Sequence, residues 1–310
     1  EASSDILAER IFDGACGSGI LLTTAFRRML GEAEARSTQQ QLSLTERIAF
    51  LRDHIFGSDV SDAACRVTAF SLYLSLLERL EPSDIAALCD DANVTLPTLR
   101  GHNLFSGPVA GDFFSAANPH FQRGGYTLCL SNPPWREPAT GERTSADVWA
   151  ENESEPVPRA LRQMAADFAW RAEAALTPNG RLSLILPMSL LLKPTSQDYL
   201  AAWLERVRWQ RVINFGDLKE LLFDDGRFSC VVLLAQRRTK LATQRWRIPV
   251  DETFEYWVPK ADVGLAFGRL TLHGVDRHDV QTQAIVDQNR ELVTRMWGDE
   301  FDMALWARLR

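Results

Sequence analysis

The chain has 310 residues, 45% of them hydrophobic and 24% charged, which is enough for one large domain or for a domain with an appendage. No apolar run reaches membrane-spanning length and no secretory segment opens the sequence, so we expect a cytoplasmic protein without a membrane partner. The formal net charge of −7 argues against nucleic-acid binding by bulk electrostatics, so any such affinity should be local or come from another domain or partner. The first residue is Glu1 rather than Met, which indicates a piece of a longer chain.

The first half of the sequence alternates short strand-like segments with longer helical ones. "RIFD" precedes a glycine turn and a helix over Ile20–Leu30, and "HIFGSD" precedes a helix over Asp62–Leu80. Two further strands are expected at "VAGDFF" and "YTLCLSN". This alternation is typical of an α/β fold with a mostly parallel sheet.

The second half continues the same rhythm. We expect a helix over Arg159–Leu176, the strand "RLSLILP", a helix over Gln197–Arg206, and the strands "RVINF" and "SCVVLLA". The continuous apolar character of the first and last of these strands indicates burial on both faces of the sheet.

Two segments break this rhythm. Glu137–Pro158 is rich in Glu, Pro, Ser and Thr and is predicted to be an exposed loop. Residues 239–310 carry several aromatics and an amphipathic stretch over Val280–Trp297. We therefore expect a catalytic domain over residues 1–238 and a C-terminal appendage, or the start of a further domain, over residues 239–310.

The five cysteines are scattered, without a CxxC pair and without neighbouring histidine ligands. We expect free, buried thiols rather than zinc or disulfides. His273 and His278 also lack the carboxylate or cysteine set that would complete a metal site, so we expect no bound metal.

The turn "FDGACGSGI" lies where the first strand ends and the first helix begins. Gly17 and Gly19 remove side chains where the backbone must turn tightly or approach a ligand, and such turns border the ligand crevice of open α/β sheets. Leu22 occupies the place of the third glycine of a dinucleotide fingerprint, and no Lys-Ser/Thr pair follows, so the turn favours a compact ligand without a phosphate. A purely structural turn is the alternative.

Two acidic residues add to this turn. Asp59 ends the second strand and can accept hydrogen bonds from both hydroxyls of a ribose, although capping of the following helix is the alternative role. Ser61 already offers that cap. Asp112 is expected at the end of the third strand, where it can accept from the amine of an adenine while Phe113 packs on the ring.

These motifs, in the order "DGACGSG", "GSDVSDAA", "GDFF" and "SNPPW", resemble the γ-type S-adenosylmethionine-dependent N6-adenine DNA methyltransferases of restriction–modification and phage-defence systems. The similarity runs from about Ile11 to Arg237 and includes "LTPNGRLSLILP" and "LLFDDGRFSCVVLLAQR". Two departures are Gly14, where the family usually has proline, and the helix that usually precedes the glycine turn, for which only about ten residues remain here.

The resemblance implies a Rossmann-like class I methyltransferase fold, with a seven-stranded sheet covered by helices on both faces. It implies S-adenosyl-L-methionine as the cofactor. The residues that would bind this cofactor are Asp13, Ala15, Gly17, Gly19, Asp59, Val60, Asp112, Phe113 and Asn132.

The "SNPPW" motif is expected to act on the exocyclic amine of adenine. This amine is conjugated with the ring and is therefore a poor nucleophile. The Asn132 side chain and the Pro133 carbonyl can accept its two hydrogens, while Pro133 and Pro134 hold these acceptors rigid. Trp135 offers a flat face for an extruded base, and Phe223 resembles the aromatic on the other side, with core packing as an equal alternative. We expect Ser131 to play no part.

The expected function is therefore methylation of the N6 amine of adenine in duplex DNA. Methylation of a protein glutamine amide or an RNA amino group by the same chemistry is an alternative, and so is a catalytically idle binding scaffold. A specificity domain, a nuclease or defence-system subunits are expected partners in a longer chain or complex. The basic stretches 206–211 and 237–247 could touch phosphates, or could be solvated charge.

Overall fold

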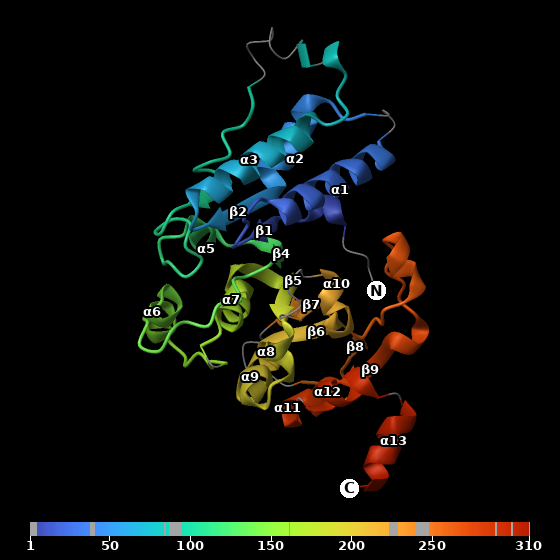
Figure 1. Cartoon of the computed structure of the whole chain (residues 1–310). Coiled ribbons are helices and arrows are strands. Elements are labelled where there is room, and N and C mark those ends of the chain that lie inside the picture. Colours follow the sequence, from blue (N-terminus) through green and yellow to red (C-terminus); the bar gives the residue numbers. More distant parts are fainter. Residues whose placement is uncertain are drawn as a thin grey trace. The chain divides into compact units, whose positions relative to one another are not determined.

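Alternating strands and helices form two separate units in the computed structural model, which describes residues 5–37, 41–83, 85–86, 95–160, 162–222, 229–239, 248–288, 290–298 and 300–309. The first unit comprises residues 1–132 with 174–177, and the second comprises residues 133–173 with 178–310. Figure 1 shows the elements of both units, coloured along the sequence. The chain thus passes from one unit to the other between Asn132 and Pro133, inside the "SNPPW" motif.

The first unit is a parallel sheet with the strand order β3–β2–β1–β4. Its elements are β1 (Ile11–Asp13), α1 (Ile20–Arg36), α2 (Leu44–His54), β2 (Ile55–Asp59), α3 (Asp62–Leu77), β3 (Leu104–Ser106), α5 (Pro119–Arg123) and β4 (Tyr126–Ser131). The helices α1 and α3 begin at the positions expected from the sequence, and Ser61 caps α3 as expected by accepting from the backbone N–H of Ala64 (3.2 Å).

The two faces of this sheet are covered by different kinds of side chain, because successive strand residues point to opposite faces. Ile11 packs in an apolar cluster with Leu22 and Phe26 of α1 and with Leu72 of α3, and Figure 1 shows α1, α2 and α3 lying together beside β1 and β2. The next residue, Phe12, faces an aromatic cluster. Its ring lies 4.8 Å from His120 of α5, 4.9 Å from Tyr126 and 6.4 Å from Phe113 between ring centres.

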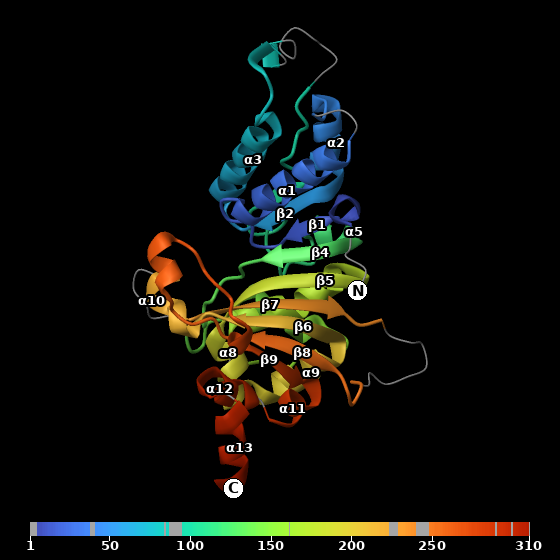
Figure 2. The ribbon, with the colours of Figure 1, turned by 90° about the vertical axis from the view of Figure 1, so that its right-hand side faces the viewer.

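The second unit is a mixed sheet with the strand order β5–β7–β6–β8–β9. Figure 2 shows these strands following one another, with α9, α11 and α12 beyond them. Its elements are α6 (Ser145–Asn152), α7 (Met164–Ala172), β5 (Leu176–Pro187), α8 (Met188–Leu192), α9 (Gln197–Arg206), β6 (Val207–Asn214), α10 (Lys219–Leu222), β7 (Cys230–Arg237), β8 (Thr253–Trp257), β9 (Arg277–Gln281), α11 (Thr282–Asp287), α12 (Arg290–Trp297) and α13 (Glu300–Leu309).

The described residues contain nine strands, so the expected number of seven is wrong. The additional strands, β8 and β9, lie beyond residue 238: β8 pairs in parallel with β6, and β9 pairs antiparallel with β8. Phe254, Tyr256 and Val280 are buried on these strands. The backbone of β8 covers the edge of β6, which would otherwise expose unpaired backbone groups. The expected domain limits of 1–238 and 239–310 stay a prediction.

Two expectations about individual elements are also corrected. The segment Glu137–Pro158 contains helix α6, whose capping box joins Thr144 and Asp147, so it is only partly a loop. Helix α7 begins at Met164 rather than Arg159, because Arg162 adopts a left-handed backbone (φ 57°) that a helix cannot contain. The amphipathic stretch Val280–Trp297 contains the helices α11 and α12, which follow the end of β9 and agree with its near-helical spacing of apolar residues.

No helix in the described ranges combines the length and the apolar character needed to cross a membrane. In those same ranges, no group of three or more His, Cys, Asp or Glu side chains could hold a metal ion.

Candidate cofactor and catalytic site

The glycine turn after β1 has the backbone that its residues allow. Gly17 (φ 53°) and Gly19 (φ 81°) both adopt the left-handed region, which favours glycine. A Cβ atom on Gly19 would lie 2.8 Å from the Thr68 side chain on α3, whereas a Cβ atom on Gly17 would meet no atom within 4 Å. Gly19 is therefore needed for close packing against α3, and Gly17 borders open space.

Thr68 was not singled out from the sequence, although it supports this turn. It is fully buried on α3, and its hydroxyl donates a hydrogen bond to the backbone carbonyl of Gly17 (2.9 Å). A threonine within an apolar helix carries no sequence signal for this role, because only the packing of α3 against the turn brings the two together.

Asp59, at the end of β2, fastens the turn from the other side. Its Oδ2 accepts from the backbone N–H of Gly17 (3.0 Å), and its Oδ1 accepts from the backbone N–H of Ser61 (2.8 Å). A carboxylate oxygen can accept more than one hydrogen bond, so both oxygens retain acceptor capacity. Val60, the neighbouring residue, is 60% exposed. Asp59 therefore orients the glycine turn and still has acceptors to offer a ligand.

Asp112 does not end the third strand, so that expectation is wrong. The strand β3 is Leu104–Ser106, and Asp112 lies in the loop that follows it. The loop turns back at Gly111, where a Cβ atom would lie 2.1 Å from the Asp59 carbonyl oxygen and 2.6 Å from the Ser106 backbone. Only glycine permits this approach, which brings Asp112 to the carboxyl ends of β2 and β3 by a different route.

The loop holds Asp112 through its backbone. Asn118 donates from Nδ2 to the Asp112 carbonyl (3.2 Å) and to the Ser58 hydroxyl (3.3 Å). The Asp112 carboxylate accepts from the backbone N–H of Phe114 (2.8 Å) through Oδ1. Within the described ranges Oδ2 makes no hydrogen bond. Phe113 is only 4% exposed and packs in the aromatic cluster described above.

Asp13, the last residue of β1, is almost wholly buried at 1% exposure. Its Oδ1 accepts from the backbone N–H of Ala15 (3.0 Å) and from the Ser131 hydroxyl (2.7 Å). Burial raises the pKa of this carboxyl to about 7, the two hydrogen bonds oppose that rise, and the negative charge of Asp59 adds to it. Ser131 therefore has a structural role, while the expectation that it takes no part in the chemistry stays a prediction.

The "NPPW" motif begins directly after Ser131. Asn132 is exposed, and its side chain makes no hydrogen bond to any residue that the structure describes. Pro133 is buried and Pro134 is exposed. In the second unit, Trp135 donates from its indole Nε1 to the Ile185 carbonyl on β5 (3.2 Å), which fixes the plane of its ring.

The first unit thus brings together Asp13, Ala15, Gly17, Gly19, Asp59 and Asp112 at the carboxyl ends of β1, β2 and β3, with Asn132 after β4. Trp135 belongs to the second unit. Phe223, the second expected base contact, lies outside the described residues.

Residues 53–221, just over half of the chain, match the Eco57I restriction-modification methylase family. The chain belongs to this family. No curated protein sequence matches the chain. As a restriction–modification methylase, the chain has S-adenosylmethionine as its cofactor.

Solved structures of restriction–modification proteins share the fold. A protein of a type I restriction–modification system has a TM-score of 0.60 at 13% identity, over 97% of this chain and 58% of its own. The EcoKI M protein of a type I restriction enzyme has 0.52 at 13% identity, over 81% of this chain and 45% of its own. A methyltransferase subunit from Streptococcus thermophilus has a TM-score of 0.50 at 14% identity, over 94% of this chain and 55% of its own.

At these identities the likeness shows the fold, which is the Rossmann-like class I methyltransferase fold expected from the motifs. The methylase spans about half the length of these solved structures.

The residues present fit S-adenosylmethionine. Open space borders Gly17, and the Asp59 and Asp112 carboxylates keep acceptor atoms for hydroxyl or amine donors of a ligand. The turn also lacks the basic residue that a phosphate-containing cofactor would favour.

Proposed function

We propose that this methylase transfers a methyl group to the exocyclic N6 amine of adenine in duplex DNA after the base is flipped out of the helix. The single observation that carries the proposal is the state of Asn132. This amide follows the carboxyl end of β4, is exposed, and is not bound to any described residue, while its neighbour Ser131 is hydrogen-bonded to the buried Asp13.

In this proposal Asn132 and Pro133 act on the target amine. The Asn132 side-chain oxygen and the Pro133 carbonyl accept its two hydrogens, which favours a pyramidal nitrogen whose lone pair can attack. Pro133 and Pro134 restrict the backbone, so the two acceptors need not rearrange during the reaction. Asp59 and Asp112 hold the ribose and the adenine of the cofactor.

The cofactor supplies an electrophilic methyl group on sulfur. The amine held by Asn132 and Pro133 would take this methyl group as its bond to sulfur broke, and S-adenosylhomocysteine would be the leaving group. The methylated amine then releases one proton to water. Direct displacement of this kind needs no covalent intermediate with the protein.

Trp135 provides the wall on which the flipped base stacks, and its bond to Ile185 sets the orientation of that wall. Phe223 is proposed to contact the base from the other side. Recognition of the target sequence belongs to further domains or subunits, together with the nuclease or defence partners of a restriction–modification system. As part of this proposal, the enzyme acts on DNA in the cytoplasm.

The test uses the complete protein that contains this chain. It is incubated with methyl-labelled S-adenosylmethionine and duplex DNA, and the DNA is digested to nucleosides. Label in N6-methyladenosine is the expected result. If the label appears only in protein glutamine or in RNA, that molecule rather than DNA is the substrate. If no methyl transfer occurs, a catalytically idle scaffold is favoured.

Asn132→Ala provides the matched control for the site. It should abolish transfer while the affinity for S-adenosylmethionine stays within about threefold, because Asn132 acts on the acceptor amine. Asp59→Ala should instead weaken cofactor binding at least about tenfold, because it loses two backbone hydrogen bonds and the ribose contact. Loss of cofactor binding in the Asn132 variant would contradict the proposed role of this residue.

A further inference from the structure

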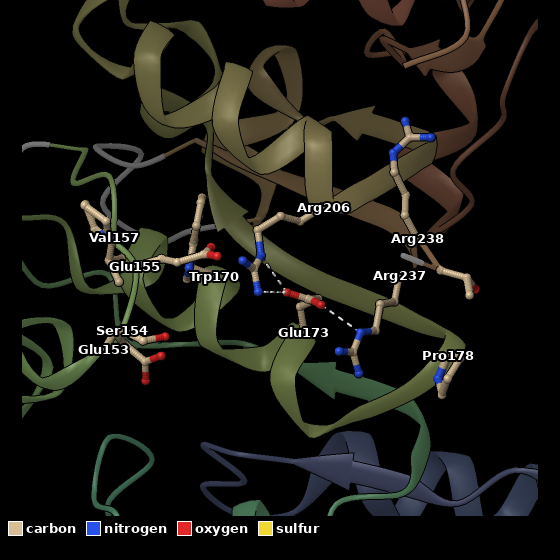
Figure 3. A pocket seen from close by; sticks show the side chains of 12 residues that line it. Glu153, Ser154, Glu155, Val157, Trp170, Glu173, Pro178, Arg206, Arg237 and Arg238 are labelled. Atoms are coloured by element: carbon tan, nitrogen blue, oxygen red, sulfur yellow. Dashed lines mark hydrogen bonds and ion pairs between the residues drawn. The ribbon is translucent and has the colours of Figure 1, made fainter. Parts of the chain in front are cut away.

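A cavity of about 430 Å³ lies in the second unit, away from the catalytic motif (Figure 3). Its walls are the segment 153–157, the end of α7, Pro178 near the start of β5, and the arginines at the ends of α9 and β7. Trp135 binds β5 at Ile185, which pairs with Val232 of β7. Arg237 is five residues further along β7, or about 17 Å at the usual strand rise, so the cavity is a separate site.

One wall of the cavity carries two guanidinium groups on one buried carboxylate. Glu173, whose side chain is 1% exposed, accepts from Arg206 (Nη2, 2.6 Å) and from Arg237 (Nε, 2.7 Å). Figure 3 shows both arginines converging on Glu173. A single negative charge between two positive ones leaves this wall with an excess positive charge. The buried carboxylate also holds both guanidinium groups in place.

Trp170 fixes the position of Arg206 further. The guanidinium carbon of Arg206 lies 5.0 Å from the centre of the Trp170 ring, within the range of a cation–π contact. The Arg206 side chain is 27% exposed and that of Arg237 is 29% exposed, so both remain accessible from the cavity. Arginines that are held from behind in this way can present a rigid donor surface to a ligand.

The third arginine of the wall, Arg238, is already occupied. It donates from Nε to the Leu204 carbonyl (3.0 Å) and from Nη1 and Nη2 to the two oxygens of Glu252. Its side chain is 13% exposed. Arg238 is therefore held in a structural ion pair with Glu252.

The opposite wall offers an acidic side chain to this positive surface. Glu153 and Glu155 are exposed, and Figure 3 shows the Glu155 side chain pointing toward the guanidinium of Arg206. No hydrogen bond or ion pair joins Glu155 to any residue that the structure describes. A carboxylate thus approaches the two arginines on the side where an anionic ligand would enter.

We propose that this cavity binds the oxyanion group, phosphate or carboxylate, of a small organic ligand. Arg206 and Arg237 hold the oxyanion, because guanidinium groups match the geometry of both groups. Glu155 competes with the ligand for the same arginines. The volume falls within the range of small-molecule sites, about 300–1,000 Å³, and leaves room for the rest of a ligand beside its anionic group.

The test titrates the complete protein with inorganic phosphate and, separately, with succinate, and follows the side-chain Nε–H NMR signals of Arg206 and Arg237. Both signals should shift with saturation, and the anion with the lower Kd identifies the preferred group. Arg206→Gln or Arg237→Gln should weaken binding about tenfold or more, as expected for the loss of charge-assisted hydrogen bonds. Glu155→Gln should tighten binding about threefold to tenfold, because it removes a competing charge.

Arg238→Gln is the matched control, because it removes one positive charge beside the cavity without removing a side chain that the proposal assigns to the anion. Its Kd should stay within about twofold of the wild-type value. If Arg238→Gln weakened anion binding as much as Arg206→Gln or Arg237→Gln, the net charge alone would attract the anion. That result would overturn the proposal.

Two further results would also overturn the proposal. One is the absence of any shift with either anion, and the other is weaker binding in the Glu155→Gln variant. Glu155 is exposed, so its variant should fold even if replacement of Arg206 or Arg237 disturbs the buried Glu173. Duplex DNA binding should be unchanged in every variant, and a loss there would make the cavity part of a DNA-binding surface instead.

Discussion

The Ser131 hydroxyl donates a hydrogen bond of 2.7 Å to Oδ1 of Asp13, across 118 residues of sequence. Both side chains are buried, and the bond joins the last residue of β4 to the last residue of β1. The residue directly after Ser131 is Asn132. The bond therefore connects the start of the "NPPW" motif with the strand that precedes the glycine turn.

Ser131→Ala should lower the free energy of unfolding by about 1–3 kcal/mol, because Asp13 loses a hydrogen bond in a buried position. Chemical denaturation followed by circular dichroism measures the change. Ser18→Ala is the control, since Ser18 is exposed in the same turn and its loss should change the free energy by no more than about 0.5 kcal/mol. Equal effects in the two variants would contradict a specific role for the Ser131 bond.

Stability should fall as the pH rises from about 4 to about 7, because of Asp13. Its carboxyl has a pKa of about 7 in the folded protein against 3.8 when unperturbed, so in this window the folded state binds the proton that the unfolded state has released. The contribution is complete below pH 4 and is lost above pH 7. A shift of about three units corresponds to at most about 4 kcal/mol.

Asp13→Asn isolates this contribution, because the amide keeps an acceptor for Ala15 and Ser131 but does not titrate. Unfolding free energies at pH 5 and pH 8 should differ less in the variant than in the wild type. Asp167 of the second unit also lowers stability as the pH rises, since burial raises its pKa to about 6. The relevant measure is therefore the difference in pH dependence between the wild type and the Asp13→Asn variant. An unchanged difference would refute the assignment to Asp13.

Gly19→Ala should impair the glycine turn more than Gly17→Ala does. Both substitutions place an alanine at positive φ, which costs about 1–2 kcal/mol, but only the first also places a Cβ atom 2.8 Å from Thr68. Calorimetric titration with S-adenosylmethionine should give the weakest binding for Gly19→Ala. A larger loss for Gly17→Ala would show that this residue approaches the cofactor more closely than the open space beside it indicates.

Trp135→Ala should raise the KM for DNA about tenfold or more, as expected for the loss of a base-stacking surface, and should leave the Kd for the cofactor unchanged. Trp135→Phe should have a smaller effect, because a flat ring remains while the bond to the Ile185 carbonyl is lost. Steady-state kinetics with duplex DNA separate the two variants. Equal loss of DNA and cofactor binding in Trp135→Ala would contradict a stacking role.

Elements with a clear local signal were predictable. Helix α9 occupies the expected residues Gln197–Arg206, and β2 ends at Asp59 as "HIFGSD" indicates. Both depend on hydrophobic periodicity and on residues next to each other in the chain. Helix α6 has such a signal in its Thr144–Asp147 capping box, but the surrounding Glu, Pro and Ser residues favoured a loop.

The position of Asp112 was not predictable in the same way. The apolar residues around it indicate a strand, but Phe113 packs against Phe12 in the aromatic cluster, and Gly111 fits against the backbone of Asp59 and Ser106. These contacts form only when distant segments pack together, and they override the local preference for a strand.

The sequence by itself determined the positions of β2, of the starts of α1 and α3 and of the glycine turn between β1 and α1, and it indicated the methylase family through the order of its motifs. These features depend on neighbouring residues, whose backbone preferences act locally. Only the tertiary structure decided which groups meet. Asp59 binds the backbone of Gly17 across 42 residues, and Ser131 binds Asp13 across 118. The high pKa of Asp13 has the same origin, because burial is produced by the packing of strands that are far apart in the chain.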